Sequence, residues 1–226
     1  MEEFHFPPVS AGLDVINPLS AGEMGVVMAK AGVGKTAFLC LLALEEIGRG
    51  GRVLHICVDE TPDKIRTWYE EILRAHGKNY PRAMIKELAS RIDSLRFIAS
   101  FLHNSFSLQR LQELTTNLIE QAKFNPTLFI LDGLDVERFD FSFFASLKTF
   151  LGEIKVPMWM SARIHQLANE KAKTGIPSPC DSIESLLDVV VLMEHGEQGM
   201  TGIRVLKNRA DFPENLYVSF SSPVLK

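Results

Sequence analysis

Short apolar runs alternate with longer amphipathic segments along most of the chain. The runs have the length of β-strands, are bounded by glycine, proline or charged residues, and mostly carry apolar residues for both faces of a sheet. They span Gly25–Ala29, Val53–Val58, Leu95–Ala99, Thr127–Leu131, Pro157–Met160, Val189–Met193, Ile203–Leu206 and Leu216–Phe220. The helix-length segments are Thr36–Gly48, Pro62–His76, Arg82–Arg91, Ser107–Lys123 and Phe141–Ile154.

This alternation predicts an α/β fold with a mainly parallel central sheet and helices on both of its faces. The last two runs follow one another without a helix, which predicts a C-terminal antiparallel hairpin with its turn in Asn208–Asn215. No low-complexity linker and no internal repeat divides the chain, so we expect one domain over residues 1–226. In such sheets, ligands bind at the carboxyl ends of the strands.

Composition and charge narrow the classes of protein that fit. The 226 residues are 46% hydrophobic and 23% charged, as in ordinary globular domains. The net charge of −4 provides no basic field for nucleic acid or anionic lipid. Cys40, Cys57 and Cys180 are widely separated, so we expect no disulfide framework and no zinc site. The N-terminus is acidic and contains prolines, unlike a secretion signal, and Ala37–Leu44 is too short to span a membrane, so a cytoplasmic protein is expected.

A glycine-rich loop joins the first predicted strand to the first predicted helix. Its sequence, AKAGVGKT, matches the phosphate-binding pattern GxxxxGK[ST] except that Ala29 replaces the first glycine. Gly32 and Gly34 permit the tight backbone, whose N–H groups bind phosphate at the helix N-terminus. Lys35 would bridge the β and γ phosphates, and the Thr36 hydroxyl would bind Mg²⁺. The candidate ATP-binding residues are Lys30, Ala31, Gly32, Val33, Gly34, Lys35, Thr36 and Ala37.

Acidic residues follow two other apolar runs. Asp132 ends the run LFILD and would complete the magnesium site from a strand neighbouring the loop strand, whereas Asp135 is more typical of a helix cap. Asp59 and Glu60 end another run, which we expect to be adjacent to the loop strand. Glu60 is the first choice for the group that activates water, and Asp59 is the second. Asp59, Glu60 or Thr61 could instead cap the next helix.

The motifs resemble, in their order and spacing, those of the RecA-like P-loop ATPases, and within them the family of the circadian-clock ATPase KaiC. The resemblance covers nearly the whole chain. The segments that carry it are Ser10–Asp14, Ala21–Val27, Asp59–Glu60, Phe129–Leu134, Ile183–Leu192 and Ile203–Arg209. The resemblance implies a slow, Mg²⁺-dependent ATP hydrolase of regulatory role that assembles into a homo-oligomer, a dimer or a hexameric ring, and acts on an unidentified protein partner.

The resemblance also implies two catalytic cations. Lys207 and Arg209 would reach the γ-phosphate held by a neighbouring subunit, where they would offset transition-state charge. The alternative is that both are solvated charges at a hairpin turn. Ser161 and Arg163 follow the run Pro157–Met160, where this fold places a polar sensor of the γ-phosphate, and the alternative for Arg163 is a surface charge.

Three other functions remain open. The chain could be an ATP-gated interaction module without significant turnover. It could be a dimeric ATPase of the MinD/ParA type, because Lys30 occupies the position of their signature lysine, although Ala31 replaces a glycine of that motif. It could also be a DNA-recombination accessory protein, but the loop Ile164–Asp181 has two lysines and no aromatic residue, a poor pattern for binding nucleic acid.

Overall fold

The computed structural model describes residues 16, 18–76, 82–102, 104–164, 175–195, 201–209 and 217–220. The predicted motif at Ser10–Asp14, and most of Ile164–Asp181 and Asn208–Asn215, lie outside this part of the chain. Its strands are β1 (Met24–Ala29), β2 (Val53–Val58), β3 (Arg96–Phe101), β4 (Leu128–Asp132), β5 (Met158–Arg163), β6 (Val189–His195), β7 (Thr201–Lys207) and β8 (Tyr217–Phe220). Its helices are α1 (Lys35–Gly48), α2 (Pro62–His76), α3 (Arg82–Leu95), α4 (Leu108–Glu120) and α5 (Phe141–Ile154), with short 3₁₀ helices η3 (Val136–Arg138) and η4 (Cys180–Leu186).

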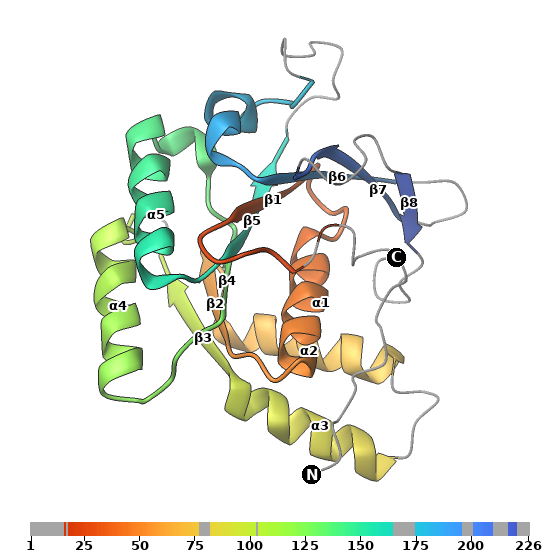
Figure 1. Ribbon diagram of the computed structural model, residues 1–226. Helices are drawn as coiled ribbons and strands as arrows, with labels where there is room; N and C mark the ends of the chain where they lie inside the picture. Colours follow the sequence, from red (N-terminus) through yellow and green to blue (C-terminus); the bar gives the residue numbers. More distant parts are fainter. Residues whose placement is uncertain are drawn as a thin grey trace.

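The strands form one sheet in the order β3-β2-β4-β5-β1-β6-β7-β8 (Figure 1). The six strands from β3 to β6 run parallel to one another, β7 is antiparallel to β6, and β8 is antiparallel to β7. The mainly parallel sheet and the C-terminal antiparallel pair are therefore confirmed. The β6–β7 pairing is also antiparallel because residues 196–200 alone separate the two strands, too few for the crossover that a parallel pair needs.

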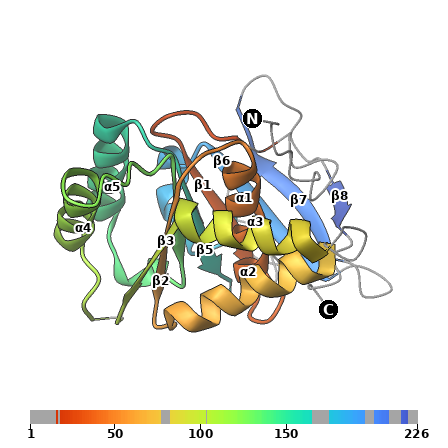
Figure 2. The same ribbon diagram turned by 90° about the horizontal axis from the view of Figure 1, so that it is seen from below.

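Helices cover both faces of the sheet, as predicted (Figures 1 and 2). On one face α1, α2 and α3 pack against side chains such as Val27 and Trp159. On the other face α4, α5 and η4 pack against side chains such as Val26 and Phe129. Because the central strands are covered on both sides, β1, β2 and β4 are buried along their whole length and carry almost no polar residues. Within the described ranges, no helix combines the length and the hydropathy of a membrane span.

His55 is a polar side chain inside the core between β2 and α2. It is fully buried, and its Nδ1 lies 3.0 Å from the Tyr69 hydroxyl, while its Nε2 has no hydrogen-bond partner among the described residues. Burial lowers the pKa of His55 to about 4; the charge of Asp132 opposes this shift and that of Arg96 adds to it. The imidazole is therefore neutral in the folded protein at pH 7.

We expect the protein to lose stability as the pH falls from 6.5 toward 4. The unfolded chain protonates His55 near its ordinary pKa of 6.5, whereas the folded chain protonates it only near 4. Between pH 7 and pH 5 this difference lowers the free energy of unfolding by about 2 kcal/mol. His55→Gln, which does not titrate, should lack this part of the decrease. Urea unfolding at pH 7, 6 and 5 measures it, and identical pH dependence in both proteins would contradict the assignment.

Candidate functional site

The glycine-rich loop lies between β1 and α1, at the edge of the sheet where the parallel strands end. Gly32 and Gly34 have φ angles of 81° and 108°, and Gly34 is the N-cap residue of α1. These left-handed conformations suit glycine because it has no Cβ. Ala29 belongs to β1, so its extended backbone accepts the extra methyl group at the first position of the motif. No described side chain caps α1, which leaves its first N–H groups to a bound anion.

Lys35 folds back onto this loop. Its Nζ donates hydrogen bonds to the carbonyl oxygens of Ala29 at 3.1 Å and Lys30 at 3.0 Å. Burial lowers the pKa of Lys35; the charge of Asp132 opposes this shift, and that of Arg163 adds to it. The ammonium group is therefore held against the backbone of the loop predicted to bind phosphate, within the electrostatic influence of a carboxylate and a guanidinium.

Asp132 accepts hydrogen bonds at both carboxylate oxygens. The Thr36 hydroxyl donates to Oδ2 at 2.6 Å, and the Ser161 hydroxyl donates to Oδ1 at 2.6 Å. The backbone N–H of Gly133 donates in turn to Ser161 Oγ at 2.9 Å, which fixes the direction of the serine proton. Asp132 and Ser161 are both buried. Because the Thr36 hydroxyl donates its proton to the hydrogen bond with Asp132, the lone pairs of its oxygen remain available to a cation.

The strands that carry Asp132 and Glu60 are not neighbours of β1, and the prediction that they are is wrong. β5 lies between β1 and β4, and β2 lies beyond β4. The chain leaves β1 through α1 to form β2 first, and β4 and β5 later occupy the space between them. Thr36, in the first turn of α1, nevertheless reaches Asp132 across the end of β5.

The acidic pair Asp59–Glu60 follows β2 beside the end of β4. Cys57 of β2 is in register with Asp132, and a Cβ atom built on Gly133 would lie 2.6 Å from the Val58 carbonyl oxygen. The chain after β2 thus adjoins the chain after β4. Asp59 turns there in the left-handed region, with φ 59°, a conformation that aspartate tolerates better than most residues.

The capping and carboxylate roles are divided among neighbouring residues. Thr61 Oγ1 accepts the backbone N–H of Lys64 at 3.3 Å, so Thr61 performs the capping of α2 that the sequence left open among three residues. The Glu60 carboxylate instead pairs with the Lys64 ammonium, with Oε1 2.5 Å from Nζ. Asp135, as predicted, is a cap: it precedes η3 and accepts the N–H of Glu137.

Lys207 and Arg209 lie at the end of the sheet where the parallel strands begin, opposite the end that carries the glycine-rich loop. Lys207 ends β7 in register with Val190, at the start of β6, and that part of β6 adjoins the start of β1. The length of β1 separates this end of the sheet from the loop, roughly 16 Å for five steps of 3.3 Å. Neither cation lies at its own chain's loop, and their predicted action on a neighbouring subunit stays a prediction.

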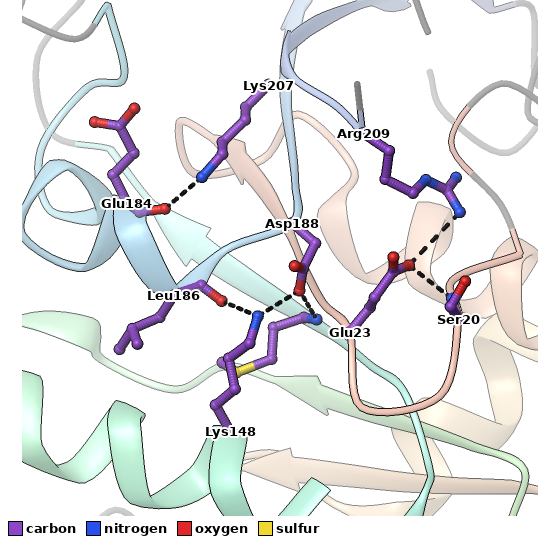
Figure 3. Close-up of polar contacts among 9 residues, drawn as sticks. Ser20, Glu23, Lys148, Glu184, Leu186, Asp188, Lys207 and Arg209 are labelled. Atoms are coloured by element: carbon purple, nitrogen blue, oxygen red, sulfur yellow. Dashed lines mark hydrogen bonds and ion pairs between the residues drawn. The ribbon is translucent and has the colours of Figure 1, made fainter. Parts of the chain in front are cut away.

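Both cations are held by their own chain (Figure 3). Lys207 Nζ donates to the carbonyl oxygen of Glu184 at 2.8 Å. Arg209 donates to the carbonyl oxygen of Pro18 at 2.9 Å, and its guanidinium lies 3.5 Å from Glu23 Oε2. A neighbouring subunit would have to draw both side chains out of these contacts.

Asp188 contacts three elements at the same end of the sheet, where the parallel strands begin. Its Oδ2 accepts the backbone N–H of Met24 at 2.7 Å and the ammonium of Lys148 at 2.6 Å (Figure 3). Lys148 also donates to the carbonyl oxygen of Leu186 at 2.7 Å. The aspartate that precedes the late apolar strand therefore connects β1, α5 and the start of β6.

Two contacts of β5 could not be read from the sequence. The polar residues that follow the apolar run of β5 point to Ser161 and Arg163 as candidates. The sequence does not show that Ser161 bonds to Asp132. Arg163, in register with Ala29, is exposed and lines a cavity of about 210 Å³ together with Gly133 and Asp135. Ser161 and Arg163 point to the same side of β5. From this one strand, Ser161 donates to Asp132 and the charge of Arg163 acts on Lys35.

The donor set fits a hard cation. A threonine hydroxyl and an aspartate carboxylate offer oxygen ligands, and Mg²⁺ is commonly held by one or two such groups together with substrate phosphates. Among the residues that the structure describes, no three His, Cys, Asp or Glu side chains cluster closely enough to hold a metal ion. Thr36 and Asp132 therefore fit a cation that arrives with a phosphate ligand.

The chain was compared with protein-family models and with curated proteins, and neither comparison found a match.

Proposed function

We propose that this chain is a RecA-like P-loop ATPase of the KaiC-like type, which binds MgATP and hydrolyses it slowly as a homo-oligomer. The observation that carries the proposal is the contact between Thr36, at the end of the glycine-rich loop, and Asp132, with Lys35 beside them. β1 is followed by α1 on one face of the sheet, and the next described element after β5 is η4 on the other face. Open α/β sheets bind ligands beside two neighbouring strands whose following elements diverge in this way.

The loop would bind the phosphates of ATP. Lys35 would exchange its bonds to two backbone carbonyls for bonds to the β and γ phosphates, a gain because charge-assisted hydrogen bonds to an anion are stronger. Thr36 and Asp132 would hold Mg²⁺, which neutralises phosphate charge when bound. Ser161 acts as a positioning residue, because it fixes the Asp132 carboxylate toward Thr36.

Glu60 would orient and deprotonate the attacking water, with Asp59 as the second choice. The pair follows the end of β2 next to the Asp132 end of β4, which supports this role. The Glu60 carboxylate must first leave Lys64, a largely solvent-exposed partner, so the exchange costs about 0–1 kcal/mol.

The second candidate is an ATP-gated interaction module. The observation that favours it is the same Glu60–Lys64 ion pair, because a carboxylate that remains paired would not activate water. A MinD/ParA-type dimer would instead use Lys30, whose exposed position on the loop supports that alternative. For a DNA-recombination accessory protein, we find no supporting contact among the described residues.

The assembled active site is tested by measuring ATP turnover per subunit against protein concentration, with sedimentation of the same samples. We expect turnover to rise with assembly. Lys207→Ala and Arg209→Ala should each reduce the assembled rate at least roughly 100-fold, because such cations stabilise the transition state. Lys123→Asn, which removes an exposed charge elsewhere at a left-handed position that asparagine tolerates, should leave turnover unchanged. Turnover that is independent of concentration and of both cations would contradict the oligomeric site.

A further inference from the structure

A cavity of about 300 Å³ lies between α2, α3 and β3. The two helices run side by side on the α1 face of the sheet (Figure 2). Arg96 and Ile98 of β3 line the cavity, and Arg96 is in register with Val53 at the start of β2. The cavity therefore lies toward the end of the sheet where the parallel strands begin, away from the glycine-rich loop. It is separate from the proposed nucleotide site.

Arg96 is a pre-organised guanidinium within this cavity. Its side chain is only 6% exposed, and its Cζ stands 4.3 Å from the centroid of the Tyr69 ring. Tyr69 is itself buried and is fixed at its hydroxyl by His55. Contact with a fixed ring restricts where the planar guanidinium lies, which leaves its N–H groups ready to bind a planar carboxylate.

A carboxylate already occupies part of that edge. Arg96 donates to Asp93 Oδ1 at 2.7 Å, but the Asp93 side chain is 72% exposed and lies only three residues away in the sequence. Arg66, which also lines the cavity, is held in the same way by Asp63, whose side chain is 88% exposed. The Arg66–Asp63 pair is solvent-exposed and therefore weak. In the Arg96–Asp93 pair only the aspartate is exposed, so a carboxylate from outside can replace the Asp93 carboxylate while the Arg96 guanidinium stays in place.

The other lining residues define the rest of the ligand. Leu73, Ile92 and Ile98 provide apolar surface beside Arg96, whereas Glu70 places a negative charge in the cavity. An apolar body is therefore favoured next to the carboxylate, and a second negative charge is disfavoured. The volume is at the lower end of the range for small-molecule sites.

We propose that this cavity binds a small organic monocarboxylate, whose carboxylate takes the place of Asp93 on Arg96 and whose apolar body lies against Leu73 and Ile92. The site is separate from the proposed nucleotide site, because no residue of the glycine-rich loop lines the cavity.

The test is a titration of the full-length, ¹⁵N-labelled protein with benzoate, followed by NMR, with the uncharged isostere benzamide as the matched ligand. Benzoate should produce saturable shifts in α2, α3 and the start of β3, and benzamide should not. Asp93→Asn removes the competing carboxylate and should tighten benzoate binding about 3-fold. Arg96→Gln should weaken it at least about 10-fold. Arg91→Gln, which alters an α3 residue outside the cavity lining, should not change it.

Three results would overturn the proposal. The first is equal shifts with benzoate and benzamide, which would show that the charge is not recognised. The second is benzoate shifts confined to the glycine-rich loop. The third is an absence of saturable benzoate binding in both the wild type and Asp93→Asn, and this variant keeps the test valid if Arg96→Gln does not fold.

Discussion

Replacing Lys35 with alanine is expected to abolish the stabilisation of this protein by MgATP. At about 100 times its Kd, a ligand stabilises the folded state by about 2.7 kcal/mol, which raises the Tm of a protein of this size by about 5–10 °C. Lys35 would supply two charge-assisted hydrogen bonds to the phosphates, so its loss should weaken binding at least about 100-fold. Thermal unfolding with and without MgATP measures the effect.

Lys30→Ala is the matched control for this experiment. Lys30 is exposed on the same loop, and it is its carbonyl oxygen, not its side chain, that contacts Lys35. Alanine keeps the backbone N–H through which Lys30, as one of the candidate ATP-binding residues, would bind phosphate, so this variant should keep the MgATP-induced shift in Tm. An unchanged shift in Lys35→Ala would contradict the phosphate-binding role of Lys35, and loss of the shift in Lys30→Ala would favour the MinD/ParA type of site.

Glu60→Gln is expected to stop ATP turnover while ATP binding persists. A positioned general base contributes about 10² to 10⁴ in rate, so phosphate release at saturating MgATP should fall at least about 100-fold. The amide keeps the shape of the side chain but cannot accept the proton. The ion pair with Lys64 is also lost, but it is exposed and contributes at most about 1 kcal/mol to stability.

Asp59→Asn separates the two acidic candidates. Asparagine tolerates the left-handed backbone of this position, so the substitution removes the charge without straining the turn. We expect Asp59→Asn to keep most of the turnover. If Asp59→Asn stops turnover and Glu60→Gln does not, the base is Asp59. If neither variant loses activity, both assignments are wrong.

The arrangement of layers could be predicted from the sequence because each parallel strand is buried on both faces. Continuous apolar runs such as Val53–Val58 and Leu128–Leu131 are hard to place elsewhere than in a covered sheet. One boundary differs: the apolar run Leu95–Ala99 predicts that Leu95 begins a strand, but Leu95 is the last residue of α3, which leads directly into β3. An apolar residue at such a junction fits both the apolar face of the helix and the apolar run of the strand.

The site was predictable where its residues are contiguous in sequence. The loop that ends in Lys35 and Thr36 requires glycines at fixed offsets, and a local pattern records them. The bond of Ser161 to Asp132 and the separation of β4 from β1 by β5 depend on strand order, which no local pattern encodes. The stacking of Arg96 on Tyr69 likewise joins residues of different elements.

The most direct test of the proposed function is equilibrium binding of ATP to the wild-type protein by isothermal titration calorimetry, with Mg²⁺ and with EDTA. The proposal predicts saturable binding of one ATP per chain in Mg²⁺, and markedly weaker binding in EDTA because Thr36 and Asp132 then hold no cation beside the phosphates. An absence of saturable ATP binding in Mg²⁺ would contradict the proposed P-loop site, and with it both the ATPase and the ATP-gated module.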